Sequence, residues 1–139
     1  MAVTYAIDLQ EKIIRTLCTG DVTMQEVVAH FRELREDPNC PSFLDVLLDV
    51  AKISILPDAR QIQAMGIEIR SLQQKVRFGL CAVIAPRDAL YGMLRVFQVV
   101  NQDYFREIRV FRTAAEAEEW LSSQRSITKG SNNQTYPNP

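Results

Sequence analysis

The chain has 139 residues, of which 47% are hydrophobic and 24% are charged, and its formal net charge at pH 7 is −1. A chain of this length forms one domain that buries about two-thirds of its unfolded surface. The near-zero charge, without a basic block, argues against electrostatic binding to nucleic acid or to anionic lipid. The first residues lack the apolar core of a signal peptide, and no run of about 18 apolar residues occurs. We therefore expect a protein of the cytoplasm with no membrane span.

The cysteine pattern agrees with that location. The three cysteines, Cys18, Cys40 and Cys81, are widely spaced and form no CxxC pair. An odd number without a disulfide framework indicates reduced thiols. Cys18 and Cys81 fall in apolar segments, where buried thiols are usually inert.

The first elements are a hairpin and a helix. Residues 3–8 and 12–19 are rich in β-forming side chains and predict two antiparallel strands. Thr23 and Glu26 have the spacing of a capping box and open a helix over 23–37. Its apolar residues share one face: Met24, Val27, Val28, Phe31 and Leu34.

Two strand and helix pairs follow. Residues 43–50 form a short, mostly apolar strand, and Asp58 is expected to cap the next helix. The inward residues of that helix are Ile62, Met65, Ile69 and Leu72. Residues 76–86 are apolar on both faces, as in a central parallel strand, and 87–102 predict a third helix.

The chain ends with a fourth pair and a polar tail. Residues 106–111 alternate charged and apolar side chains, which suits an edge strand. Thr113 and Glu116 have the spacing of a second capping box, opening a short helix that ends near Leu121. Residues 122–139 are polar, with Gly and Pro, and predict a flexible tail.

This order, one strand followed by four βα units, predicts a single α/β domain over residues 1–121. Strands that alternate with helices need right-handed crossovers and a mainly parallel sheet. We expect five strands and four helices, with the first strand antiparallel and at an edge.

Several stretches resemble a known family: "CTGDVTMQEVVAHFRELREDP", "DVLLDV", "VIAPRDALYGMLRVF" and "VFRTAAEAEEWL". They are similar to the bacterial SpoIIAA-like family, which is related to STAS and CRAL-TRIO domains, and the resemblance covers residues 3–121. It implies a STAS-type fold and a non-enzymatic regulatory or protein-interaction module. Because CRAL-TRIO relatives enclose lipids, it also implies an alternative, a carrier of an apolar small molecule.

The phosphorylation motif of STAS-type antagonists is missing here. That motif, Asp-Ser-Ser-Gly, falls without gaps on Pro57, Asp58, Ala59 and Arg60, so both serines are absent. Asp58 is then either a plain helix cap, the reading that we favour, or a permanent negative charge that imitates the phosphorylated state.

A ligand or partner junction is predicted where two strands end. Arg87 and Asp88 follow the central strand at the start of a helix, a position at which open α/β sheets often bind ligands. Together with Asp58 and Arg60 they form the candidate site. The alternative is that Asp88 caps the helix and Arg87 is solvated, and no Gly-rich phosphate loop is present.

The sequence gives little support for a metal site or for catalysis. His30, the only histidine, shares a helix face with Glu26 and Glu33, which favours a solvated polar face over a metal site. We expect no metal, no cofactor and no enzyme activity. Five residues could line an apolar pocket or simply pack in the core: Met24, Phe31, Met65, Met93 and Phe97.

The helix over 87–102 carries a second apolar stripe. It consists of Ala89, Gly92, Val96 and Val99. Either flanking helices cover this stripe, or it is exposed and pairs with a second copy of the chain. We expect a homodimer through this surface.

Overall fold

The computed structural model describes residues 2–134, which form one five-stranded sheet in the order β1-β2-β3-β4-β5. The strands are β1 (Ala2–Asp8), β2 (Ile13–Gly20), β3 (Phe43–Ile53), β4 (Arg77–Ile84) and β5 (Glu107–Phe111). The helices are α1 (Met24–Glu36), α2 (Ala59–Leu72), α3 (Asp88–Asn101) and α4 (Ala114–Gln134), with a 3-10 turn, η1 (Gln102–Tyr104), after α3. β1 pairs antiparallel with β2, and the other pairs are parallel. The predicted α/β fold is confirmed, including the antiparallel first strand at an edge.

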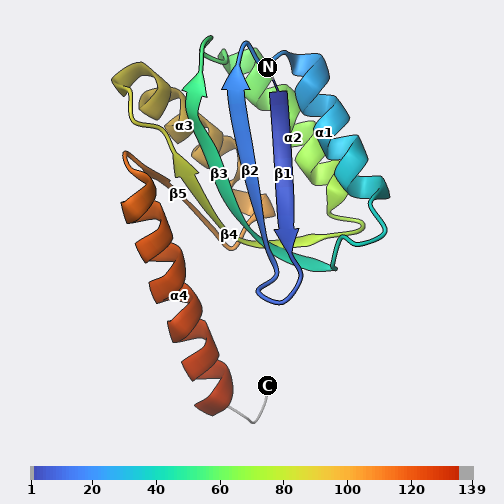
Figure 1. Ribbon diagram of the computed structural model, residues 1–139, viewed down its shortest axis with the longest axis vertical. Coiled ribbons are helices and arrows are strands. Elements are labelled where there is room, and N and C mark those ends of the chain that lie inside the picture. Colours follow the sequence, from blue (N-terminus) through green and yellow to red (C-terminus); the bar gives the residue numbers. More distant parts are fainter. Residues whose placement is uncertain (1, 135–139) are drawn as a thin grey trace.

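The helices are divided unequally between the two faces of the sheet. Helices α1, α2 and α3 cover one face, and α4 packs on the opposite face (Figure 1). The strand order explains this division. Each crossover advances by one strand in the same direction, so right-handed connections place all three crossover helices on one side. Helix α4 leads to no further strand and can cover the other face.

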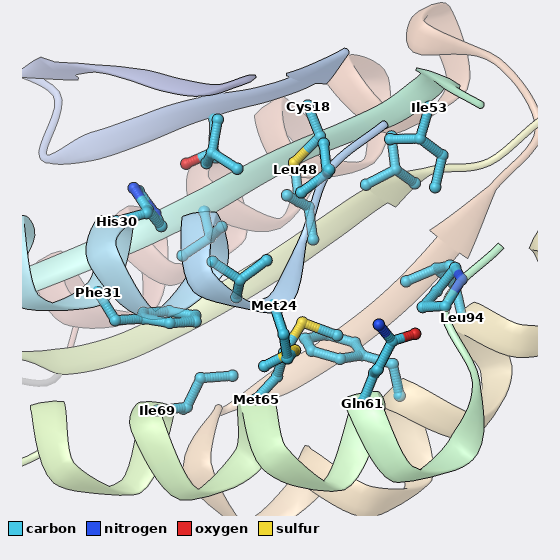
Figure 2. Close-up of a pocket in the computed structure, with 18 of the residues that line it drawn as sticks. Cys18, Met24, His30, Phe31, Leu48, Ile53, Gln61, Met65, Ile69 and Leu94 are labelled. Carbon is cyan, nitrogen blue, oxygen red and sulfur yellow. The ribbon is translucent and has the colours of Figure 1, made fainter. Parts of the chain in front are cut away.

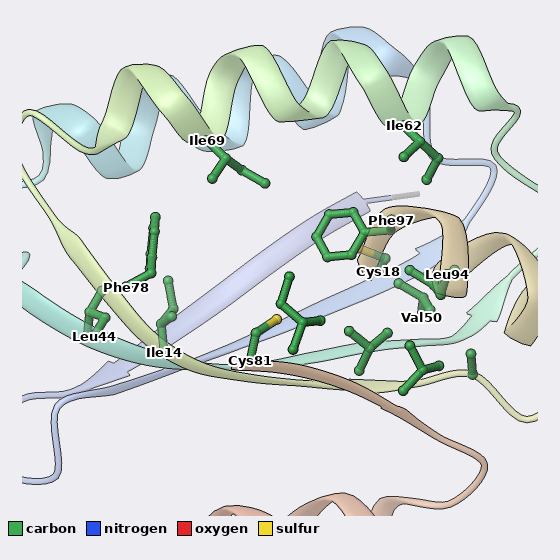
Figure 3. Close-up of a cluster of buried hydrophobic side chains, with 14 of the residues drawn as sticks. Ile14, Cys18, Leu44, Val50, Ile62, Ile69, Phe78, Cys81, Leu94 and Phe97 are labelled. Atoms are coloured by element: carbon green, nitrogen blue, oxygen red, sulfur yellow. The ribbon is translucent and has the colours of Figure 1, made fainter. Parts of the chain in front are cut away.

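Two apolar cores result, one on each face. The larger lies beneath α1, α2 and α3 (Figure 3) and the smaller beneath α4. Strand β4 contributes to both, because alternate side chains point to opposite faces. Cys81 and Val83 belong to the larger core, whereas Ala82 and Ile84 belong to the smaller. The strand predicted to be central is accordingly buried along almost its whole length.

Capping boxes fix where α1 and α2 begin, as predicted for α1. The Thr23 hydroxyl accepts from the Glu26 amide at 3.2 Å, and the Glu26 carboxylate accepts from the Thr23 amide at 2.9 Å. Asp58 and Gln61 form the same reciprocal pair at 2.8 and 2.9 Å. These contacts satisfy amides that the helix itself cannot pair.

Helix α4 is longer than predicted. Its expected end near Leu121 is wrong, because the helix continues to Gln134. No glycine interrupts it before Gly130 and no proline occurs within it, so its polar composition is compatible with a helix. Arg125, within the segment expected to be a flexible tail, pairs with Asp45 of β3. Residues 135–139 of that tail lie outside the described residues.

Candidate functional site

An apolar cavity of about 150 Å³ lies between the sheet and helices α1 and α2 (Figure 2). Strands β2 and β3 form its floor, with Cys18 and Leu48 among the lining residues. Helix α1 contributes Met24 and Phe31, and α2 contributes Met65. Leu94 and Phe97 of α3 also belong to the lining.

Of the five residues for which the sequence left pocket lining and core packing open, four line the cavity. Met24, Phe31, Met65 and Phe97 line the cavity, whereas Met93 is not among the lining residues. The first three remain half-buried although their helices pack on the sheet. Their side chains therefore border the space without filling it.

The linker between β3 and α2 forms the mouth of the cavity. Ile55, Leu56 and Pro57 belong to the lining, and the side chains of Ile55 and Leu56 are exposed. Because exposed side chains line it, the cavity reaches the surface here. A ligand site was predicted at this junction through its charged residues, Asp58 and Arg60. In the structure, the apolar residues of the junction line the cavity instead.

The charged residues of that junction lie outside the lining of the cavity. The Asp58 carboxylate is occupied by the capping box of α2, as the cap interpretation predicts. Arg60 is exposed in the first turn of the same helix, and neither residue lines the cavity. In the described part of the chain, no hydrogen bond or ion pair links Asp58 or Arg60 to Arg87 or Asp88.

The start of α3 differs from the prediction in two ways. Asp88 does not cap the helix, because its carboxylate forms an ion pair with Arg112, which follows β5. The Arg87 guanidinium donates to the carbonyl oxygen of Ile53 at 2.8 Å instead of being fully solvated. Adjacent parallel strands end at one edge of the sheet, which brings these groups within reach of each other.

His30 is buried, so the predicted solvated position is wrong. Its side chain is 8% exposed and lines the cavity, with its ring centroid 5.2 Å from that of Tyr5 on β1. Burial lowers the pKa of His30 to about 4, so the imidazole is neutral at neutral pH. One sequence signal was available, since His30 follows Val27 by three residues and precedes Leu34 by four, the spacing of the apolar face.

The cavity offers no ready nucleophile among its thiols. Burial raises the pKa of Cys18 to about 11, and it raises the pKa of Cys81 further still. Both thiols are protonated at neutral pH and react weakly. The predicted burial of Cys18 and Cys81 is confirmed. Within the described residues, no three His, Cys, Asp or Glu side chains gather in a way that could hold a metal ion.

The second apolar stripe of α3 is uncovered. Ala89, Gly92, Val96 and Val99 are all exposed, and a Cβ atom at Gly92 would meet nothing within 4 Å. The flanking helices therefore leave this surface open. Its role in self-association stays a prediction.

Comparison with known proteins assigns neither a family nor a function to this chain. No family model matches the sequence, and no curated protein matches it either. Among the described residues, no helix combines the length and the hydropathy needed to cross a membrane. The resemblance to the SpoIIAA-like family stays a prediction from the motifs alone.

Proposed function

We propose that this chain is a non-enzymatic binding module of SpoIIAA-like type whose ligand is an apolar small molecule held between the sheet and helices α1 and α2. The observation that carries the proposal is the cavity, with its apolar lining and its apolar mouth at Ile55 and Leu56. Pockets of this composition are typical of small-molecule sites. An apolar guest would gain contacts that the lining residues now lack.

The absence of enzyme activity is part of the proposal. A general base or nucleophile needs a tuned pKa and a partner that orients it. The neutral His30 and the protonated Cys18 in the lining support binding in preference to catalysis.

Native mass spectrometry of the protein purified from the organism that encodes it tests the proposal. Leu48→Phe places a larger side chain into the cavity, and Ile67→Phe makes the same kind of change on the exposed surface of α2. We expect the wild type and Ile67→Phe to retain one small molecule and Leu48→Phe to lose it. A wild-type protein with no bound molecule, or retention by Leu48→Phe, would contradict the proposal.

A second candidate function is protein interaction, and the exposed α3 stripe favours it. The occupant that we propose is a second copy of the chain, since the small residues Ala89 and Gly92 permit close helix approach. A net charge of −1 offers little repulsion. The family resemblance also supports a regulatory protein partner, and the free cysteines support a cytoplasmic location.

Sedimentation at micromolar concentration tests the homodimer. Val96→Glu places a charge within the stripe and should convert a dimer to a folded monomer. Gln102→Glu, an exposed change just after α3, should leave the dimer intact. A monomeric wild type would disprove self-association, and a dimeric Val96→Glu would exclude this surface.

A further inference from the structure

One residue that lines the cavity, His30, has a buried polar atom without a partner, its Nδ1. Three buried side-chain nitrogen or oxygen atoms of the described residues have no hydrogen-bond partner: His30 Nδ1, Asn101 Oδ1 and Trp120 Nε1. Of these residues, His30 alone lines the cavity. Its side chain is more than nine-tenths buried, and Figure 2 shows its imidazole projecting from α1 toward the sheet.

The other polar groups at the cavity are weaker candidates for contacting a ligand. Thr23 and Gln61 line it at the starts of α1 and α2, where both side chains are engaged in capping boxes. The Thr16 hydroxyl, also in the lining, forms no hydrogen bond within the described part of the chain, but it is less completely buried than His30 Nδ1. A buried nitrogen without a partner destabilises the empty protein, so a ligand that satisfies it gains that difference.

The chemistry of His30 limits what the ligand can carry. A neutral imidazole has one donor nitrogen and one acceptor nitrogen, and a hydroxyl group can match either because it both donates and accepts. A carboxylate would be buried here among apolar side chains without a cation in the lining, which is costly. One hydroxyl is therefore a better match than an acid.

The size of the cavity limits the apolar part. A volume of about 150 Å³ is several times the roughly 30 Å³ that one water molecule occupies, and apolar cavities of this size admit benzene. One aromatic ring or a short alkyl chain fits such a space, whereas a long acyl chain does not.

We propose that the ligand is a small alcohol, with one ring or a short chain, whose hydroxyl hydrogen-bonds to His30 Nδ1. This inference rests on the proposed function and narrows its ligand class from apolar small molecules in general to small alcohols. His30 would then orient the guest while Met24 and Met65 contact its apolar part.

Nuclear magnetic resonance with two matched probes tests the proposal. Benzyl alcohol and ethylbenzene differ in a hydroxyl against a methyl group, and pure transfer from water favours ethylbenzene. The methyl signals of Met24 and Met65 report on the cavity, and Met93, outside the lining, is the internal control. Because the chain has a single histidine, its ring nitrogen signals are unambiguous.

We expect both probes to shift Met24 and Met65 but not Met93. Benzyl alcohol alone should shift the Nδ1 signal. His30→Phe keeps an aromatic ring beside Tyr5 but removes the hydrogen-bonding nitrogen, so the ratio of benzyl alcohol affinity to ethylbenzene affinity should fall roughly fivefold relative to the wild type.

The results that would contradict this inference differ from the results that would contradict the proposed function. If neither probe shifts Met24 and Met65, both the inference and the proposed function are wrong. If the affinity ratio of the two probes is the same in the wild type and in His30→Phe, or if Nδ1 does not respond to benzyl alcohol, the inference alone is wrong. Should His30→Phe fail to fold, the wild-type Nδ1 signal decides the question, since it should respond to benzyl alcohol and not to ethylbenzene.

Discussion

Burial of His30 makes the stability of the fold depend on pH. Desolvation lowers its pKa from 6.5 to about 4 in the folded protein. Between these values the unfolded chain binds more protons than the folded one, so protonation favours unfolding. The contribution is complete above about pH 6.5 and is lost as the pH falls toward 4. We expect this single group to lower the free energy of unfolding by about 2 kcal/mol between pH 7 and pH 5.

Urea unfolding of the wild type and of His30→Phe at pH 7 and pH 5 measures this contribution. Carboxylates titrate in both proteins, so the difference between their pH-dependent losses isolates His30. The variant should lose about 2 kcal/mol less than the wild type. Equal losses would show that the imidazole is not buried as a neutral group.

Gly79 of β4 occupies a position that excludes any side chain. An added Cβ would lie 2.3 Å from Asp45 Oδ1 and 2.6 Å from Phe43 Cζ. The carboxylate cannot easily withdraw, because it accepts from the Leu80 amide at 2.8 Å. Gly79→Ala should lower the free energy of unfolding by about 2 kcal/mol. Gly92→Ala, in open space on α3, should raise it by up to about 1 kcal/mol, and similar effects in urea unfolding would contradict this packing.

In addition to its apolar contacts, helix α4 forms one buried and one exposed ion pair with strands of the sheet. The Asp45 side chain is 7% exposed and that of its partner Arg125 is 20% exposed. Arg125 also pairs with Glu11 in the β1–β2 turn at 3.2 Å. In the exposed pair, Arg15 of β2 lies 3.1 Å from Glu118, and both side chains are 48% exposed.

Removing each arginine should have very different effects. Arg125→Ala leaves the Asp45 carboxylate buried without its cation and should cost about 3 kcal/mol of unfolding free energy. Arg15→Ala, the matched control on the same helix interface, should cost less than about 1 kcal/mol. Chemical denaturation measures both, and equal costs would mean that α4 does not depend on the Asp45 pair.

At the scale of elements, the sequence predicted what periodicity and capping determine. The apolar run of β4 and the capping box at Thr23 are local patterns, and the structure confirms both. The continuation of α4 was missed because the polar composition of residues 122–134 suggested a tail, whereas Arg125 contacts Asp45, eighty residues earlier in the chain. The cap considered for Asp88 is absent because its carboxylate pairs with Arg112, which is distant in the sequence and follows β5.

For the whole molecule, the βα alternation of the sequence predicts a mainly parallel sheet, but it does not predict the cavity. Its existence depends on how side chains from both sheet and helices meet, and no single stripe reveals a gap. The sequence identified Met24, Phe31 and Met65 as apolar without showing that they would leave space. The burial of His30 was missed because Glu26 and Glu33 suggested a polar face, while α1 turns that imidazole toward Tyr5.

A crystal structure of the protein under xenon pressure tests most directly whether the fold contains a space that an apolar molecule can enter. Xenon binds in dry apolar cavities and needs no polar contact. We predict a xenon site between the sheet and helices α1 and α2, in contact with Leu48, Met65 and Phe97. The absence of xenon there, with Met24 and Phe31 turned inward to fill the space, would contradict the proposed binding function.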